Sequence, residues 1–361
     1  MSTLIFIAVI VVLIVVHEFG HFVAAKLSGM QVDEFGLGYP PRALTLGTIG
    51  ETKYTLNWLP FGGFVKIFGE DGGSGSRSFS SRPRILQAVV LVAGILMNLL
   101  FAYVLITGAL MFGTPRALSP AEIATATQVE LAVANVLPSS PAAEAGIVPG
   151  DSIMRASDTN GQWTAADPKS FSTFIAASGG EVVTLEIKQN GKEQSVVATP
   201  RTGMIAADPH RFALGVEVAT IGIVPLSFWN ALTQGAELTW GALTLTAYGL
   251  GHFFYGILTF SADLSQVAGP VGIAGVVGSA SAQGLGDLFS IMAIISINLA
   301  LINLIPIPAL DGGRLLFVII ESIIRRPIKP RVAQTVNAIG FALLILLMVV
   351  VTAHDVFKIL H

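Results

Sequence analysis

The 361-residue chain has no cysteine, and charged residues make up only 12% of it. The missing thiols exclude disulfide bonds, thiolate nucleophiles and cysteine-bound metals, so a metal would need histidine or carboxylate ligands. A soluble domain carries about 25% charged residues. Because 53% of this chain is hydrophobic, an ordinary soluble protein and a disordered chain are excluded. The formal net charge of −3 offers no basic surface, so no nucleic-acid partner is expected.

Four stretches are apolar and long enough to span a lipid bilayer. They cover residues 3–24, 85–112, 288–310 and 335–353. The first is not typical of a cleavable signal peptide, because it has no positively charged start and contains His17 and Glu18. The sequence therefore predicts a polytopic α-helical membrane protein with four transmembrane helices in a lipid bilayer.

Lysine and arginine are distributed unevenly among the connecting segments. Loop 25–84 contains seven of them and loop 311–334 contains five, whereas residues 113–287 contain seven against 14 acidic residues. The positive-inside rule places the first two loops in the cytosol. The N-terminus, the long middle segment and the C-terminus are then expected outside.

The middle segment has the composition of a soluble α+β domain over residues 130–223, preceded by a linker at 114–129. Apolar and polar residues alternate over 183–187, and Asn190-Gly191 is typical of a hairpin turn. We expect this domain between an N-terminal membrane half, 1–113, and a C-terminal membrane half, 285–361, with residues 224–284 as the connection to the latter.

The first apolar stretch contains the motif H-E-x-x-H, formed by His17, Glu18 and His21. Positions i and i+4 share one helix face, so both imidazoles can bind one zinc ion and Glu18 can serve as general base toward water. Ionisable residues inside a membrane are energetically expensive and usually functional. About 21 Å of helix separates Thr3 from His17, so the site is expected within the membrane and nearer its cytosolic face.

A catalytic zinc site takes a third protein ligand and keeps one position open. Asp311 follows the third apolar stretch, where Pro306 and Pro308 break the helix and two glycines follow. Its carboxylate is then presented at the same membrane face as the two histidines. The alternative is an ordinary aspartate at the lipid interface, but the matching topology favours a third zinc ligand.

Residues 225–258 carry an apolar stripe at helical spacing, and Glu237 is the one charged residue among them. An extra membrane crossing here would place Asp311 on the side opposite His17, and no zinc site could form. We therefore expect an amphipathic helix lying at the outer membrane surface.

Together these motifs resemble the site-2 protease family of intramembrane zinc metalloproteases, and most closely its bacterial regulator-of-sigma-E protease type. The resemblance rests on H-E-x-x-H together with N-x-x-P-x-P-x-L-D-G-G at 303–313, and on G-x-x-x-N at Gly94 and Asn98. Residues 58–65 resemble the family's membrane re-entrant β-hairpin, and 136–151 resemble a circularly permuted PDZ domain. The best-known relatives carry two tandem PDZ domains, whereas this segment has room for one.

The resemblance implies one zinc ion per chain, a cell inner membrane location and further site residues. Asn303 would contact substrate or stabilise the oxyanion, and Asn98 would pack near the site or hold the substrate backbone. A substrate-binding hairpin would include Gly62, Gly63 and Phe64, and the PDZ groove would include Leu214, Gly215 and Val216. Either asparagine could instead make an ordinary polar contact between helices.

A transmembrane helix must be unwound before its peptide bonds can be cut, because its backbone groups are hydrogen-bonded internally. An exposed strand edge at membrane depth could pair with the unwound segment. We expect residues 53–59 and 63–68, joined at 60–62, to form that hairpin; the alternative is a cytosolic hairpin with no substrate role.

The predicted function is thus an intramembrane zinc endopeptidase that cleaves single-span membrane proteins, such as an anti-sigma factor or remnant signal peptides. One alternative is a catalytically silent membrane scaffold that binds partners through the PDZ-like domain. Another is a metal transporter, but transporters tend to show paired half-repeats, which this sequence lacks. The PDZ-like domain itself either binds peptide or forms a rigid plug.

Overall fold

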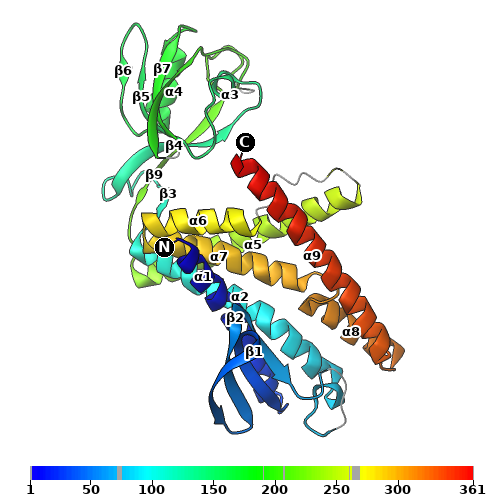
Figure 1. Cartoon of the computed structure of the whole chain (residues 1–361). Helices are drawn as coiled ribbons and strands as arrows, with labels where there is room; N and C mark the ends of the chain where they lie inside the picture. Colours follow the sequence, from blue (N-terminus) through cyan, green and yellow to red (C-terminus); the bar gives the residue numbers. More distant parts are fainter. Residues whose placement is uncertain are drawn as a thin grey trace. The chain divides into compact units, whose positions relative to one another are not determined.

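The computed structural model describes residues 2–70, 75–189, 191–205, 208–259, 261 and 269–360. The chain divides into two compact units. One consists of Met1–Phe112 together with Ser227–His361, and the other of Gly113–Leu226 (Figure 1). The first unit carries the long apolar helices and is called the membrane unit below; the second is called the β unit.

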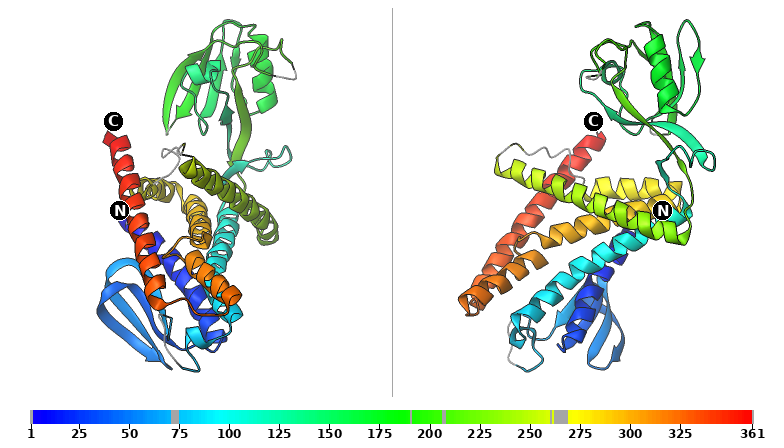
Figure 2. Two further views of the ribbon diagram at one scale, coloured as in Figure 1. Left: turned by 90° about the vertical axis from the view of Figure 1, so that its right-hand side faces the viewer. Right: turned by 180° about the vertical axis from the view of Figure 1, so that it is seen from behind.

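The membrane unit contains the four predicted spans as helices. They are α1 (Ser2–Leu27), α2 (Arg84–Phe112), α7 (Leu285–Leu304) and α9 (Pro330–Leu360). Among the described residues these four are the helices long and apolar enough to cross a membrane, so the predicted number is confirmed. Helices α2 (cyan) and α7 (orange) run side by side in Figure 1 and in both views of Figure 2. Helix α7 ends at Leu304 rather than at 310, because the residue before Pro306 is held extended.

Three further helices belong to this unit: α5 (Phe228–Leu258), α6 (Pro270–Gln283) and α8 (Asp311–Ile324). Helix α5 confirms the helix expected over 225–258, and its position at a membrane surface stays a prediction. Residues 311–324 were expected within a loop, and that expectation is wrong. The two glycines at the start of α8 have a low helix propensity, so the sequence there does not indicate a helix. Packing stabilises the helix instead, because Gly312, Gly313 and Val318 are buried.

A sheet of two long strands follows α1: β1 (Val32–Ile49) and β2 (Thr52–Ile67). Both strands bend, so that residues 34–37 of β1 pair with β2 on both sides. Residues 63–66 are their partners on one side, and residues 53–56 are their partners on the other. Segments 53–59 and 63–68 are thus extended as expected, but they are not paired with each other, and that prediction was wrong. The chain reverses at Gly50 and Glu51, whereas residues 60–62 only bend β2 at Gly62, whose φ is +98°.

After β2, the short helix η1 (Phe79–Ser81) leads into α2. The β unit then forms one sheet with the strand order β3-β9-β4-β5-β7-β8, and β6 pairs with β5. Its elements are β3 (Pro115–Ala117), β4 (Thr127–Val136), α3 (Pro141–Glu144), β5 (Ser152–Ser157), β6 (Gln162–Trp163), α4 (Pro168–Ala177), β7 (Val183–Gln189), β8 (Lys192–Ala198) and β9 (Val216–Ile223).

The β unit has its own hydrophobic core and is larger than expected. The predicted hairpin is confirmed, because Leu185 pairs with Val196 between β7 and β8. Asn190, expected in its turn, lies outside the described residues. Segment 114–129 is not a plain linker, because β3 lies within it and pairs with residues 221–223 of β9. The core beneath the sheet is formed by Leu131, Leu185, Ile187 and Phe171.

Candidate metal centre

Helix α1 places His17 and His21 one turn apart on the same face. Each is 8% exposed, and their ring centroids lie 4.8 Å apart in an edge-on arrangement. Their Nε2 atoms approach to 3.2 Å. The i, i+4 spacing thus brings two nitrogen ligands to one point inside a membrane-spanning helix.

Helix α2 can approach these imidazoles because Gly94 has no side chain. A Cβ atom at Gly94 would lie 2.4 Å from Nε2 of His21 and 2.9 Å from Cε1 of His17. Any other residue at this position would therefore displace the two rings. Gly94 and Asn98 lie one turn apart on α2, so the G-x-x-x-N motif presents both residues to the histidines.

Asp311 comes from far along the chain and is the first residue of α8. Its Oδ2 lies 2.9 Å from Nε2 of His17 and 3.2 Å from Nε2 of His21. The sharp turn before α8 requires Gly312, because a Cβ atom there would be 2.4 Å or less from the carbonyl oxygens of Leu304 and Ile305.

A second set of contacts orients the two rings. Nδ1 of His21 donates to the carbonyl oxygen of Val90 at 2.8 Å, so its Nε2 keeps a free lone pair. Nδ1 of His17 lies 3.3 Å from Nδ2 of the fully buried Asn98. The backbone of Asn98 is held in turn by Ser296 on α7, whose Oγ donates a 2.8 Å hydrogen bond to the backbone carbonyl oxygen of Asn98.

The hydrogen bonding of the Asn98 side-chain amide indicates whether His17 can act as a metal ligand. Its Oδ1 is buried and has no hydrogen-bond partner among the described residues. A half-turn of the amide places Oδ1 where it can accept a hydrogen bond from the Nδ1–H group of His17. In that tautomer Nε2 of His17 is unprotonated, as a metal ligand must be.

The donor set itself suits zinc. One atom each from His17, His21 and Asp311 lies within 4.8 Å of the others, and the described residues contain no second such group of histidine and carboxylate ligands. Two imidazole nitrogens and one carboxylate oxygen leave a fourth tetrahedral position open, which is the arrangement of a catalytic zinc site.

Glu18 faces a different neighbour from the two histidines. It follows His17 by one residue, about 100° around the helix, and lies beside β2. A Cβ atom at Gly63 would lie 3.6 Å from Cγ of Glu18. Residues 63–66 form the edge of the first sheet, since their pairing partners within the described chain are on one side only. Glu18 therefore stands between the metal ligands and a free strand edge.

Two other predicted substrate residues, Gly62 and Phe64, belong to this part of β2. Gly62 marks the bend in β2, and the ring of Phe64 covers its cross-strand partner Gly36. Asn303 lies in the last turn of α7, partly exposed, and is eight residues before Asp311. The structure thus brings His17, His21, Asp311, Glu18 and Asn98 together with Gly63. It gives no contact that assigns a role to Asn303.

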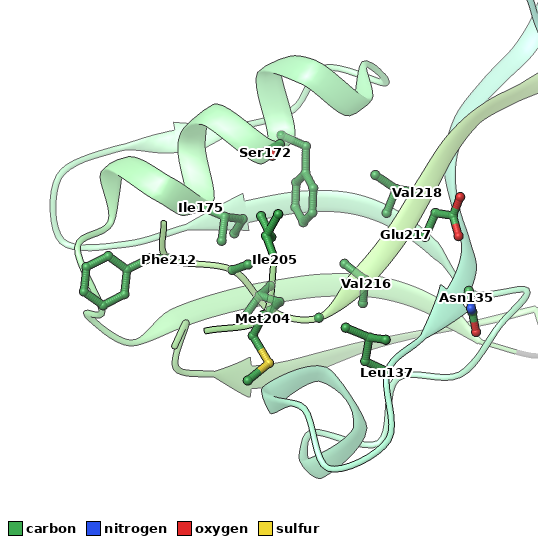
Figure 3. Close-up of a pocket in the computed structure, with 14 residues that line it drawn as sticks. Asn135, Leu137, Ser172, Ile175, Met204, Ile205, Phe212, Val216, Glu217 and Val218 are labelled. Carbon is green, nitrogen blue, oxygen red and sulfur yellow. The ribbon is translucent and has the colours of Figure 1, made fainter. Parts of the chain in front are cut away.

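The predicted groove of the β unit is a cavity of about 420 Å³ between β9 and α4 (Figure 3). Leu214, Gly215 and Val216 line it, opposite Phe171 and Ile175 of α4. Strand β3 pairs only with residues 221–223, which leaves the start of β9 with an open edge toward this cavity. Gly215 has a φ of +76°, and a Cβ there would meet Cβ of Ser140 at 2.4 Å, so this position requires glycine.

Sequence reasoning missed the residues that position the site. Val90, Ser296 and the ion pair between Glu70 and Arg314 were not singled out. For Arg314 a signal existed, since it is three residues after Asp311. Val90 acts through its backbone, so its side chain could not reveal it.

Comparison with known proteins gives consistent results. The family model of Peptidase family M50 matches residues 5–347. The chain is 36% identical over 346 residues to a protein of Clostridium perfringens named "Putative zinc metalloprotease", with 95% of each chain covered. It is 34% identical to a protein of the same description from Nostoc sp., covering 96% of this chain and 93% of that one.

Solved structures similar to a part of the chain include the PDZ domain of an SdrC-like protein from Listeria monocytogenes, at 17% identity and a TM-score of 0.21. The match covers 25% of this chain and 86% of that domain.

Proposed function

The chain belongs to peptidase family M50 and is a membrane zinc metalloprotease; from that premise we propose that it cleaves single-span membrane proteins within or near the bilayer. The observation that carries the proposal is the convergence of His17, His21 and Asp311 inside a bundle of membrane-spanning helices. A soluble substrate would not reach ligands at this depth, whereas a transmembrane segment could enter from the side.

His17, His21 and Asp311 would hold the zinc ion. When bound, zinc supplies a Lewis acid that polarises the peptide carbonyl and acidifies water. Glu18 follows His17 directly in the chain and is not itself a proposed ligand. We assign it the role of general base, which takes a proton from the attacking water and delivers it to the leaving amine.

The edge of β2 would receive the substrate. A transmembrane helix exposes its peptide bonds only when it unwinds, and its freed N–H and C=O groups then need new partners. The free edge at 63–66 offers such partners beside Glu18. Strand addition there would set one peptide bond of the substrate next to the base.

The rest of the first sheet supports a place for it in the membrane. Its outer part exposes large apolar side chains, among them Leu44, Leu46, Trp58 and Leu59, which are 48–71% exposed. Such a surface would be unfavourable in water, so we propose that this sheet re-enters the cytosolic side of the membrane.

The β unit would select or exclude substrates outside the membrane. Its groove between β9 and α4 is apolar and open along the start of β9, which suits an extended peptide. Val218→Glu, on the groove face of β9, tests this idea. It should change which substrates are cut and leave zinc content unaltered; a rigid plug predicts no change in substrate choice.

Substitution of the base tests the proposed function. Glu18→Gln should retain one zinc ion per chain, because all three ligands remain, and should remove cleavage of a tagged single-span substrate in reconstituted membranes. Glu144→Gln, an exposed position in the β unit, is the matched control. Cleavage by Glu18→Gln at the parent rate would refute the assignment. A parent protein that binds zinc but cleaves no membrane substrate would favour the scaffold alternative.

A further inference from the structure

A second cavity, of about 470 Å³, lies in the membrane unit among α2, α8 and the start of α9. The turn after β2 and the helix η1 also contribute to its wall. None of the three proposed zinc ligands lines it, and the function proposed above does not use it.

This cavity lies at a membrane boundary. Arg84 lines it and begins α2, and Ala333 lines it in the first turn of α9. Both helices are candidate membrane spans, at Arg84–Phe112 and Arg331–Phe357. A space lined by the first turns of two spans lies where lipid headgroups meet the hydrocarbon core.

The chemistry of the cavity is divided between apolar and cationic groups. Leu91, Phe317 and Val318 form apolar wall, while Arg84, Arg314 and Lys329 carry positive charge. Its two carboxylates are already engaged: Glu70 pairs with Arg314, and Glu321 lies 2.7 Å from Arg84 and accepts from the backbone N–H of Ile328 at 2.8 Å.

Lys329 adds a further positive charge to the wall of the cavity. No ion pair within 4 Å is found for it among the described residues, nor for its neighbours Arg325, Arg326 and Arg331. Residues 325–331 thus place three cations directly before α9 and a fourth, Arg331, in its first turn. Their role in membrane orientation explains the charge, but it does not explain an apolar cavity beside it.

We propose that this cavity binds an anionic phospholipid, with its phosphate at Lys329 and the first part of an acyl chain against Leu91, Phe317 and Val318. Arg331 does not line the cavity, but it lies two residues after Lys329 and adds to the positive charge that attracts the headgroup. Basic pockets between transmembrane helices on the cytosolic side are suited to such headgroups. A zwitterionic lipid would bring an ammonium group toward the cluster and be disfavoured.

The bound lipid would also hold the ligand-bearing helix. The cavity is lined by α8, which begins at Asp311, and by Asn337 of α9, whose Oδ1 accepts a 3.2 Å hydrogen bond from the backbone N–H of Ala309. A lipid in this cavity would contact α2, α8 and α9 at once and hold them together. Its binding should therefore raise the unfolding temperature of the protein.

The test measures lipid retention and needs no substrate, so it is independent of the proposed proteolysis. Full-length protein is purified from nanodiscs of equal phosphatidylglycerol and phosphatidylcholine, and native mass spectrometry counts the lipid that stays bound. Phosphatidylglycerol should be retained preferentially. Each basic residue near the headgroup strengthens the binding of an anionic lipid about fivefold. The double variant Lys329→Gln/Arg331→Gln removes two such residues, so it should lower phosphatidylglycerol retention more than tenfold. Lys169→Gln/Lys192→Gln, an equal charge change in the β unit, should not.

A second pair of variants tests the cavity without changing charge. Ala333→Trp fills it and should also reduce retention more than tenfold, whereas Val332→Trp, at an exposed neighbouring position, should not. Equal retention of the two lipids, or full retention by Ala333→Trp, would overturn the proposal. So would inorganic phosphate raising the unfolding temperature as much as phosphatidylglycerol does, because that result would indicate an anion site with no lipid.

Discussion

Gly94→Ala should empty the metal centre while adding a single methyl group. The added Cβ would lie 2.4 Å from Nε2 and 2.7 Å from Cε1 of His21, and 2.9 Å from Cε1 of His17. Carbon and nitrogen atoms make favourable contact at about 3.5 Å, so the rings or α2 must move by about 1 Å. The backbone of α2 is helical here, so the strain falls on the imidazoles rather than on φ and ψ.

The cost of this displacement is about 1–3 kcal/mol of folding free energy, as for an extra methylene in a packed core. Helix propensity acts in the opposite direction, since alanine is favoured over glycine by about 1 kcal/mol in a helix interior. The net loss of stability is therefore small. The loss of zinc should be large, because a shift of about 1 Å separates Nε2 of His21 from the position that a zinc–nitrogen bond requires.

Zinc content of the purified protein, measured by elemental mass spectrometry beside a thermal unfolding curve, checks this prediction. Gly275→Ala is the matched control, because Gly275 lies within α6 and a Cβ there would meet nothing within 4 Å. The control should keep one zinc ion per chain and gain slightly in stability. A Gly94→Ala protein with full zinc content and unchanged cleavage would refute the packing argument.

Three further predictions concern other contacts. Asn98→Ala should weaken zinc binding 10- to 100-fold in a chelator competition, because it removes the partner that orients His17; an unchanged affinity would assign Asn98 to helix packing. Asp355→Ala should lower stability by about 1 kcal/mol in thermal unfolding, since its Oδ2 accepts from the Gly272 N–H at the start of α6; Asp208→Ala, at an exposed position, is the control. The hydrogen bond from Arg116 lowers the pKa of Glu122 to about 2, so this pair stabilises the β unit above the ordinary glutamate pKa and loses that effect as the pH falls toward 2. Unfolding of Glu122→Gln should therefore depend less on pH between 4.5 and 2 than that of the parent.

The three proposed metal ligands, which the structure brings together, are each marked in the sequence by a local pattern. His17 and His21 are one helical turn apart in an apolar helix, and Asp311 stands where prolines end α7 and glycines begin α8. The four spans likewise follow from long runs of mostly apolar residues. None of these predictions requires knowledge of which distant segments pack together.

The pairing of β2 could not be predicted in the same way. Segments 53–59 and 63–68 are both extended, and a Pro-Phe-Gly-Gly sequence between them is typical of a turn. Their true neighbour is 34–37, which is brought between them by bends in both strands. Strand register depends on distant partners, so a local turn signal misassigned the pairing. Asn98 was expected near the site from the family resemblance alone, because its contact with His17 spans 81 residues and no local pattern marks it.

The central claim is that the chain hydrolyses a peptide bond at membrane depth with zinc held by His17, His21 and Asp311. The most direct measurement is mass-spectrometric mapping of the bond cut in a single-span substrate that is reconstituted with the purified protein. We predict a cut within the transmembrane segment or at its cytosolic end, which stops when zinc is chelated and resumes when zinc is restored. A cut confined to the outer soluble part of the substrate, or one that persists without zinc, would contradict the account.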